Sequence, residues 1–348
     1  MKKILVALMA LSLVLLAFPA MAEGSGQPLR VGLMPSAVGA PVQYAMENGY
    51  FAEEGLNVSM VIFPTGAAIN EAMAAGELDV ACSGAATVFA LANGETTLLG
   101  DVEMSGGMGI WVMPDSDILS VKGQIEKYPE MYGSAETLKG KRFICNLGTA
   151  SQFNVLRYLA QFGLTDEDVE LINMDWASGV QAFAAGEGDA IATFSPYSAQ
   201  AEAAGGVKCC SFEDATETAL YDMVFASKNV VAERRADVVA FLKGFYKATE
   251  ELAADNAMRA EWSKKWFASE GREYDDATMQ QEIIDRPYVT KALLTSDAYV
   301  LGDAMYSYAE FNVGIEKIED WQLENVKTCF DASLISEAIG ATVKQPQF

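Results

Sequence analysis

The sequence of 348 residues contains no histidine. Histidine titrates near neutral pH, so it is the common general base of enzymes, and it is also the commonest ligand in zinc sites. Its absence excludes Ser-His-Asp and Cys-His catalysis and the usual zinc centres. We therefore predict that the protein is not an enzyme and that it has no catalytic residue, no metal and no cofactor.

Cysteine is also scarce. The five cysteines match no metal-binding spacing, and their odd number leaves at least one without a disulfide partner. We interpret most of them as small, buried apolar residues. A disulfide from the adjacent pair at positions 209 and 210 remains an alternative. The full set is Cys82, Cys145, Cys209, Cys210 and Cys329.

Basic residues are half as numerous as acidic ones, with 24 Lys and Arg against 48 Asp and Glu, and the formal net charge is -24. Such an acidic surface repels the phosphates of nucleic acids and of anionic lipids. We therefore expect no nucleic-acid partner. The chain is expected to be a monomer.

Long apolar runs are absent except at the amino terminus. Two lysines at positions 2 and 3 precede an apolar run at positions 4–18, and the small-residue pattern Ala20-Met21-Ala22 follows. The run is shorter than the roughly 20 residues of a membrane-spanning helix. We predict a signal peptide at residues 1–22, cleaved after Ala22, and a periplasmic protein. An uncleaved anchor is disfavoured because no cysteine at the cleavage site could carry a lipid.

An internal repeat dominates the rest of the chain. Residues 72–81, AMAAGELDVA, return at 182–192 as AFAAGEGDAIA. Before each copy lies an expected strand, a short turn and a helix: 29–34, 35–38 and a helix to 48 in the first half, then 142–146, 148–151 and a helix to 162 in the second. Each helix ends at a glycine, which favours the left-handed cap. Two α/β units of similar construction are therefore expected.

The order of strand, helix and strand predicts an α/β fold of two doubly wound, Rossmann-like lobes joined by a two-strand hinge. We expect lobe I at residues 27–110 plus 226–348 and lobe II at 111–225, with extended segments near 110–113 and 223–226 crossing between them. The apolar stripe of residues 235–255 indicates a helix that returns to cover the first lobe.

Several motifs together carry a family likeness. They are Gly49-Tyr50-Phe51 with Glu54-Gly55-Leu56, Ala75-Gly76-Glu77 with Asp79, and Leu138-Lys139-Gly140-Lys141 before Gly148-Thr149. Over residues 30–256 the chain resembles the substrate-binding proteins of ABC importers for sulfonates, taurine and nitrate, in the superfamily that includes the THI5-like (NMT1-like) proteins.

The resemblance implies a type II periplasmic-binding-protein fold. A small solute would be held in the cleft between the lobes, and lobe closure would signal to an ABC permease in the membrane. One alternative is a ligand-sensing module for a membrane receptor. Another is a THI5-like enzyme, which the lack of histidine disfavours because the chemistry of that branch depends on it.

The ligand should lie at the carboxyl ends of the strands, where loops meet helix amino termini with unpaired N–H groups. Small and hydroxyl-bearing residues follow the expected strands there, together with two aromatic residues and one acid. The candidate ligand-binding residues are Ser36, Val38, Thr65, Gly66, Ser83, Gly84, Gly148, Thr149, Ala150, Ser151, Asp175, Trp176, Ser195 and Tyr197.

Each candidate also has an ordinary structural interpretation. Serine and threonine before a helix are preferred caps whether or not a ligand binds. Trp176 and Tyr197 could stack on a ligand or lie in the core, and Asp175 could pair with a ligand amine or cap the following helix. None of these loops contains a lysine or arginine, so a neutral or amine-bearing ligand is favoured over a bare sulfonate or nitrate.

Overall fold

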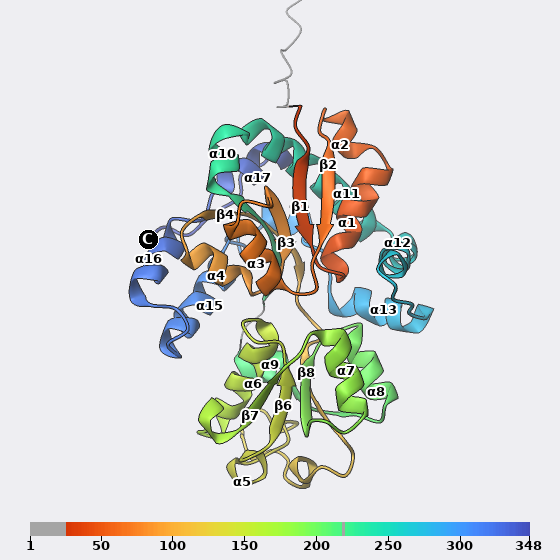
Figure 1. Cartoon of the computed structure of the whole chain (residues 1–348), viewed down its shortest axis with the longest axis vertical. Helices are drawn as coiled ribbons and strands as arrows, with labels where there is room; N and C mark the ends of the chain where they lie inside the picture. The colour runs from red at the N-terminus through yellow and green to blue at the C-terminus, as the bar shows by residue number, and fades with distance from the viewer. Residues whose placement is uncertain (1–25, 218–219) are drawn as a thin grey trace, which may run out of the picture.

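A computed structural model describes residues 26–217 and 220–348, so the predicted signal peptide lies outside the described residues. The chain forms two α/β lobes, one above the other in Figure 1, and each is built on a five-stranded mixed sheet. The predicted fold class is confirmed. Within the described residues, no helix is both long and apolar enough to cross a membrane.

The sheet of lobe I has the strand order β2-β1-β3-β10-β4. Its strands are β1 (Leu29–Leu33), β2 (Val58–Ile62), β3 (Val80–Ser83), β4 (Thr96–Met104) and β10 (Tyr221–Ser227). Strand β10 is antiparallel to both of its neighbours, whereas β1 is parallel to β2 and β3. The helices between these strands are α1 (Ala40–Glu47), α2 (Tyr50–Glu53), α3 (Gly66–Ala74) and α4 (Thr87–Ala92), with the short 3-10 helix η1 (Ala37–Gly39) before α1.

The sheet of lobe II has the same pattern, with the order β7-β6-β8-β5-β9 and β5 antiparallel to its neighbours. Its strands are β5 (Gly109–Val112), β6 (Arg142–Cys145), β7 (Glu170–Asn173), β8 (Ala190–Thr193) and β9 (Val207–Ser211). The helices are η2 (Asp117–Ser120), α5 (Ala135–Leu138), α6 (Ala150–Gln161), η3 (Asp166–Asp168), α7 (Trp176–Ala184), α8 (Tyr197–Ala203) and α9 (Phe212–Thr216).

The internal repeat extends to matching ion pairs. Arg30 at the start of β1 pairs with Asp79 before β3, at 2.6 Å between Nη2 and Oδ1. Arg142 at the start of β6 pairs with Asp189 before β8, at 3.2 Å between Nε and Oδ2. In each pair the aspartate also accepts the backbone N–H of the arginine at 2.8 Å. Each pair therefore joins neighbouring parallel strands at the edge opposite their carboxyl ends.

Both segments expected to cross between the lobes lie within strands of a sheet. Residues 110–112 belong to β5 in the second sheet, and 223–226 lie within β10 in the first sheet. The chain instead crosses between β4 and β5, at residues 105–108, and between α9 and β10. All these strand residues are apolar and buried, so the sequence pattern could not assign them to one sheet or the other. We propose that the lobes divide at these two connections.

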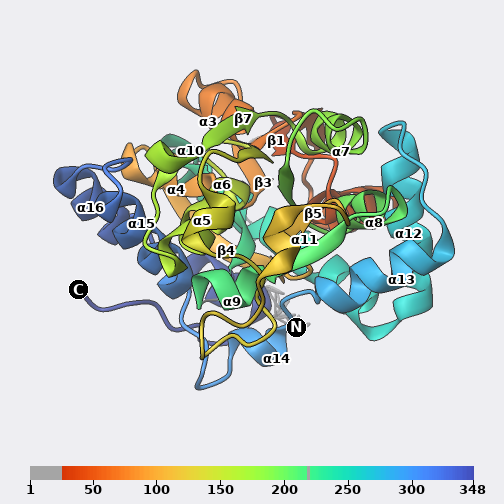
Figure 2. The same ribbon diagram turned by 90° about the horizontal axis from the view of Figure 1, so that it is seen from below.

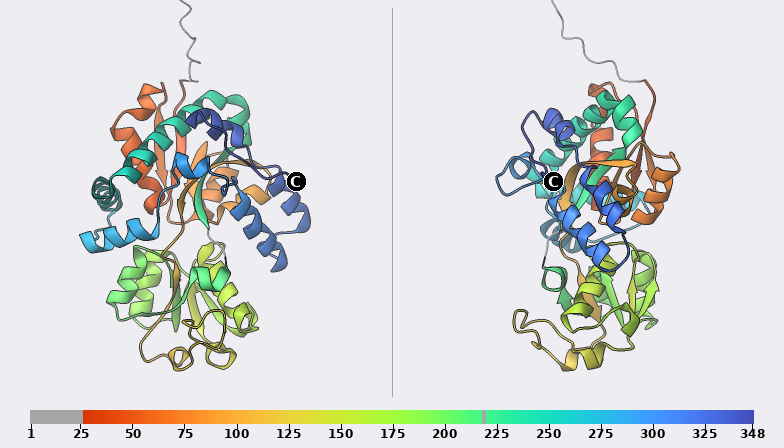
Figure 3. Two further views of the ribbon diagram at one scale, coloured as in Figure 1. Left: turned by 180° about the vertical axis from the view of Figure 1, so that it is seen from behind. Right: turned by 90° about the vertical axis from the view of Figure 1, so that its left-hand side faces the viewer.

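The carboxyl-terminal tail consists of helices that surround lobe I. They are α10 (Lys228–Glu233), α11 (Arg235–Ala254), α12 (Asn256–Ser269), α13 (Asp276–Asp285), α14 (Lys291–Leu294), α15 (Asp303–Gly314), α16 (Asp320–Lys327) and α17 (Ala332–Ile339). The apolar stripe of α11 packs on the first lobe, where Phe241 stacks on Phe51 at 5.2 Å between ring centroids. Figure 3 shows that the tail stays with lobe I, while its lowest helices extend down toward lobe II.

The five cysteines are free and buried, which confirms their interpretation as small core residues. Cys209 and Cys210 lie in β9 and form no disulfide. Burial raises the pKa of the Cys145 and Cys209 thiols to about 12, so both stay protonated at neutral pH.

Candidate functional site

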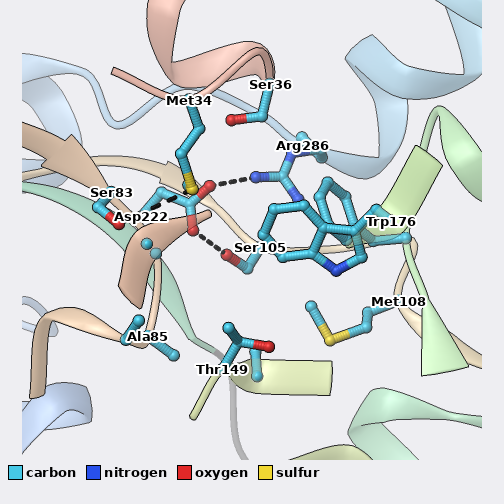
Figure 4. A pocket seen from close by; sticks show the side chains of 15 residues that line it. Met34, Ser36, Ser83, Ala85, Ser105, Met108, Thr149, Trp176, Asp222 and Arg286 are labelled. Atoms are coloured by element: carbon cyan, nitrogen blue, oxygen red, sulfur yellow. Dashed lines mark hydrogen bonds and ion pairs between the residues drawn. The ribbon is translucent and has the colours of Figure 1, made fainter. Parts of the chain in front are cut away.

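A hollow with about 380 Å³ of space between atoms lies where the two lobes meet. Both lobes and the tail contribute to its wall, and Figure 4 shows the side chains converging on it. The space is small, so a ligand must be small or the lobes must open to admit it. The lining residues are Met34, Ser36, Gly66, Ser83, Gly84, Ala85, Ala86, Ser105, Met108, Thr149, Ala150, Trp176, Phe194, Asp222 and Arg286.

Half of the fourteen candidate residues line this hollow. They lie at or just after the carboxyl ends of β1, β2, β3, β6 and β7, up to the first residue of the following helix. The carboxyl ends of parallel strands meet at one edge of each sheet. The two sheets turn these edges toward each other. The candidates that line the hollow are Ser36, Gly66, Ser83, Gly84, Thr149, Ala150 and Trp176.

Five other candidates do not line the hollow, and two of them make hydrogen bonds to the backbone. The Thr65 hydroxyl caps α3 by accepting the Ala68 N–H at 3.2 Å. The Ser151 hydroxyl donates to the Ala192 carbonyl at 2.6 Å. Three more do not line the hollow, and they are Val38 in η1, Gly148 before α6 and the buried Ser195. Thr65 therefore acts as a helix cap, which is the alternative interpretation of such residues given above.

Asp175 and Tyr197 do not line the hollow either. Asp175 caps α7, since its Oδ1 accepts the N–H groups of Ala177 and Ser178 at 3.0 and 3.1 Å. Burial alone would raise the pKa of Asp175, but the bonds from Ser178 and Ala177 lower it, so the carboxylate stays ionised on its own helix. Tyr197 donates its hydroxyl to the Pro35 carbonyl of lobe I at 3.1 Å.

Trp176 and Ser36 present polar atoms to the hollow. The Trp176 ring lies edge-on to Phe194 at 4.9 Å between centroids, and its partly buried indole lines the wall. Within the described part of the chain, neither Nε1 of Trp176 nor Oγ of Ser36 has a hydrogen-bond partner. A buried donor without a partner costs about 1 to 3 kcal/mol. Both groups are therefore available to an acceptor atom of a ligand.

The charged part of the wall comes from residues that the strand-end rule does not select. Arg286 follows α13 in the tail, and its guanidinium donates to the carboxylate of Asp222 in β10. The Ser105 hydroxyl donates to the other oxygen of Asp222 at 2.7 Å. Figure 4 shows this pair beside Trp176. The cleft therefore does contain an arginine, contrary to what the loops suggested, and the sequence places it about 90 residues beyond the last of those loops.

Behind this wall lies a buried cluster of charges. Arg286 donates to Oε1 of Glu103 at 2.7 Å, and Nη2 of Arg259 lies 3.8 Å from Oε2 of the same residue. Glu282 in α13 is fully buried nearby, and neither of its oxygens has a hydrogen-bond partner in the described ranges. Burial raises the pKa of Glu103 and of Glu282, while the two arginines oppose the rise. With Asp222, three carboxyl groups share two guanidinium groups.

A hollow between two such lobes, lined by strand-end loops and helix amino termini, defines a two-lobed ligand-binding protein. The chain belongs to the NMT1-like family, whose model matches residues 23–267, so the resemblance found in the sequence is confirmed.

Curated relatives agree with this placement. A protein of Brachyspira hyodysenteriae described as an ABC transporter periplasmic binding protein is 32% identical over 318 residues, which is 91% of this chain and 91% of the relative. A protein of Escherichia coli described as an aliphatic sulfonates-binding protein is 27% identical and covers 68% of this chain and 69% of its own length.

Solved structures show the same fold. The alkanesulfonate-binding protein SsuA of Xanthomonas axonopodis, bound to MOPS, has a TM-score of 0.67 at 20% identity and covers 87% of this chain and 98% of its own. The nitrate-binding protein NrtA of Synechocystis has a TM-score of 0.70 at 14% identity, with coverages of 90% and 88%. At these identities the likeness concerns the fold alone.

Proposed function

We propose that this protein captures a small organic solute outside the cytoplasmic membrane and delivers it to the permease of an ABC importer. Family membership and the descriptions of the relatives support this function. The observation that carries it is the hollow at the meeting of the lobes, with the unpartnered donors of Ser36 and Trp176. A signal peptide at residues 1–22 would place the protein in the periplasm.

The wall favours a neutral or amine-bearing ligand of small size. Arg286 lines the hollow, but Glu103 and Asp222 already accept its hydrogen bonds, so it offers no uncompensated positive charge to a bare anion. Most of the remaining lining is apolar or small, including Met34 and Trp176. A suitable ligand would place an apolar face on the indole and an acceptor atom near its Nε1.

A thermal-shift screen of the purified protein tests this function. The compounds are small amines, neutral pyrimidines, aromatic acids and alkanesulfonates. A ligand at 100 times its dissociation constant stabilises the protein by about 2.7 kcal/mol. We expect a shift from members of the neutral or amine classes and none from the sulfonates. A screen in which sulfonates alone bind would contradict the ligand class, and one in which nothing binds would count against the function.

The Trp176→Ala variant tests the location of the site. Truncating a stacking aromatic in a closed site costs about 2 kcal/mol or more, whereas a neutral hydrogen bond contributes about 1 kcal/mol. Calorimetric titration with any hit should therefore show a larger loss of affinity for Trp176→Ala than for Ser36→Ala. Trp321→Ala is the control, because Trp321 is 58% exposed on α16 and does not line the hollow. Equal affinity in all three variants would show that the ligand binds elsewhere.

A further inference from the structure

The tail of the chain reaches lobe II on both flanks of the hollow. The α12–α13 region lies on one side and α15 on the other, as Figure 2 shows from below. The tail residues that contact lobe II lie beyond residue 267, where the match to the family model ends. The family match therefore assigns them no role.

On one flank, an arginine of the tail and a tyrosine of lobe II share one carbonyl group of lobe I. Nη1 of Arg272, between α12 and α13, donates to the Pro35 carbonyl at 2.7 Å. The Tyr197 hydroxyl, at the start of α8, donates to the same carbonyl at 3.1 Å and accepts a second bond from Arg272. Burial raises the pKa of Tyr197 to about 12, so the phenol keeps its proton at neutral pH and remains a donor.

These contacts lie directly beside the hollow. The Arg272 guanidinium lies 5.3 Å from the centroid of the Tyr197 ring, and that ring stacks against Trp176 of the wall at 6.3 Å between centroids. The turn that carries Pro35 is itself fixed in lobe I, because Nε1 of Trp266 donates to the Ser36 carbonyl at 2.7 Å. A movement of lobe II away from lobe I would therefore break the bond from Tyr197.

On the other flank the contact is aromatic. Phe153 of α6 in lobe II lies edge-on to Tyr308 and Phe311 of α15, at 4.7 and 4.3 Å between ring centroids. The Arg157 guanidinium, also on α6, lies 5.5 Å from the Phe311 ring. The tail thus contacts lobe II through hydrogen bonds on one side of the hollow and through rings on the other.

We propose that Arg272 and Tyr197 form a latch that holds the lobes closed over the ligand, and that Phe311 completes the closure on the opposite flank. These are positioning residues, since they act through the relative placement of the lobes. The latch rests on the proposed function in one respect, which is that closing the lobes would serve to capture the solute. It concerns a lobe equilibrium that can be measured without any ligand.

Distances between spin labels test the latch. Cysteines introduced at Ala75 and Ala185 place one label on each lobe, at exposed positions just after α3 and α7. The five native cysteines are buried and should not react. Double electron–electron resonance on the labelled chain should give one dominant distance. Each lost hydrogen bond changes an equilibrium by roughly fivefold to tenfold. Tyr197→Phe and Arg272→Gln should therefore each raise the ratio of open molecules, with the longer distance, to closed molecules by that factor. Phe311→Ala, which removes the ring packed on Phe153, should raise the same ratio.

Two matched controls separate a latch from general loosening. Tyr158→Phe removes a buried hydroxyl whose 2.6 Å bond to the Tyr132 carbonyl lies within lobe II. Arg235→Gln removes an exposed guanidinium that pairs with Glu337 within lobe I. Neither control should change the distances. The proposal is overturned if the latch variants keep the original distance, and equally if the controls shift as much as they do. Failure to find a solute in the thermal screen would leave this result unaffected and would count against the proposed function alone.

Discussion

Replacing Arg286 with methionine should be one of the most destabilising single substitutions in this protein. Methionine keeps much of the length of the side chain but removes the guanidinium that donates to Glu103 and Asp222. Arg259 is then the arginine that remains beside Glu103, at 3.8 Å, and Glu282 still has no hydrogen-bond partner in the described ranges. Breaking a buried ion pair from one side typically costs about 3 to 5 kcal/mol. We expect a loss of this size in the free energy of unfolding at pH 9.

The loss in the free energy of unfolding should be smaller at pH 5. The direction of this pH dependence follows from the carboxyl group of Glu103. Burial already raises the pKa of Glu103, with Arg286 opposing the rise, so removal of the guanidinium raises that pKa further. The native state then holds more protons than the unfolded state above the ordinary pKa of glutamate. Stability therefore falls as the pH rises through this window. In the native protein burial raises the pKa of Glu103 to about 8, so the difference in protonation between the variant and the native protein develops above pH 8. At pH 5 Glu103 is protonated in both proteins, and this part of the penalty is absent.

Urea unfolding followed by far-ultraviolet circular dichroism at the two pH values measures both effects. Arg235→Met is the control, since this exposed arginine pairs with Glu337 at the surface, where such pairs contribute about 1 kcal/mol or less. Adding Glu103→Gln to Arg286→Met should recover part of the stability at pH 9. A loss below about 1 kcal/mol, or the same loss at both pH values, would refute the reasoning.

Two further predictions concern the crossing segment and a buried acid. Gly106→Ala would place its Cβ 1.9 Å from the Asp285 carbonyl oxygen, so chemical denaturation should show a loss of stability of about 2 kcal/mol or more. The control Gly314→Ala, whose Cβ would have no atom within 4 Å, should be neutral or slightly stabilising, and equal effects of the two substitutions would contradict the steric argument. Burial raises the pKa of Asp101 to about 7, although Tyr299 donates a hydrogen bond to this carboxyl group. Between pH 5 and pH 8 the native protein should therefore lose about 2 to 3 kcal/mol more stability than the Asp101→Asn variant does. Parallel curves of stability against pH for the two proteins would disprove this.

Much of the site could be predicted from the sequence because the strand-end rule depends on local order alone. The repeat and the glycine-terminated helices locate the ends of the parallel strands, and Ser36, Gly66 and Trp176 all lie at those ends. Whether an individual side chain faces the ligand could not be predicted in this way. Asp175 shows why, because a carboxylate before a helix can turn back onto the helix N–H groups, and here it does.

The sequence by itself determined the two α/β units, their likeness to each other and the family, because hydrophobic periodicity and short motifs are properties of neighbouring residues. Only the tertiary structure decided which sheet each crossing strand joins, since buried strands of the same composition fit either sheet. It also brought Arg286 to the hollow and Arg272 beside it, from a tail without recognisable motifs. Contacts between residues so far apart along the chain arise from how the layers pack, and no local pattern in the sequence encodes them.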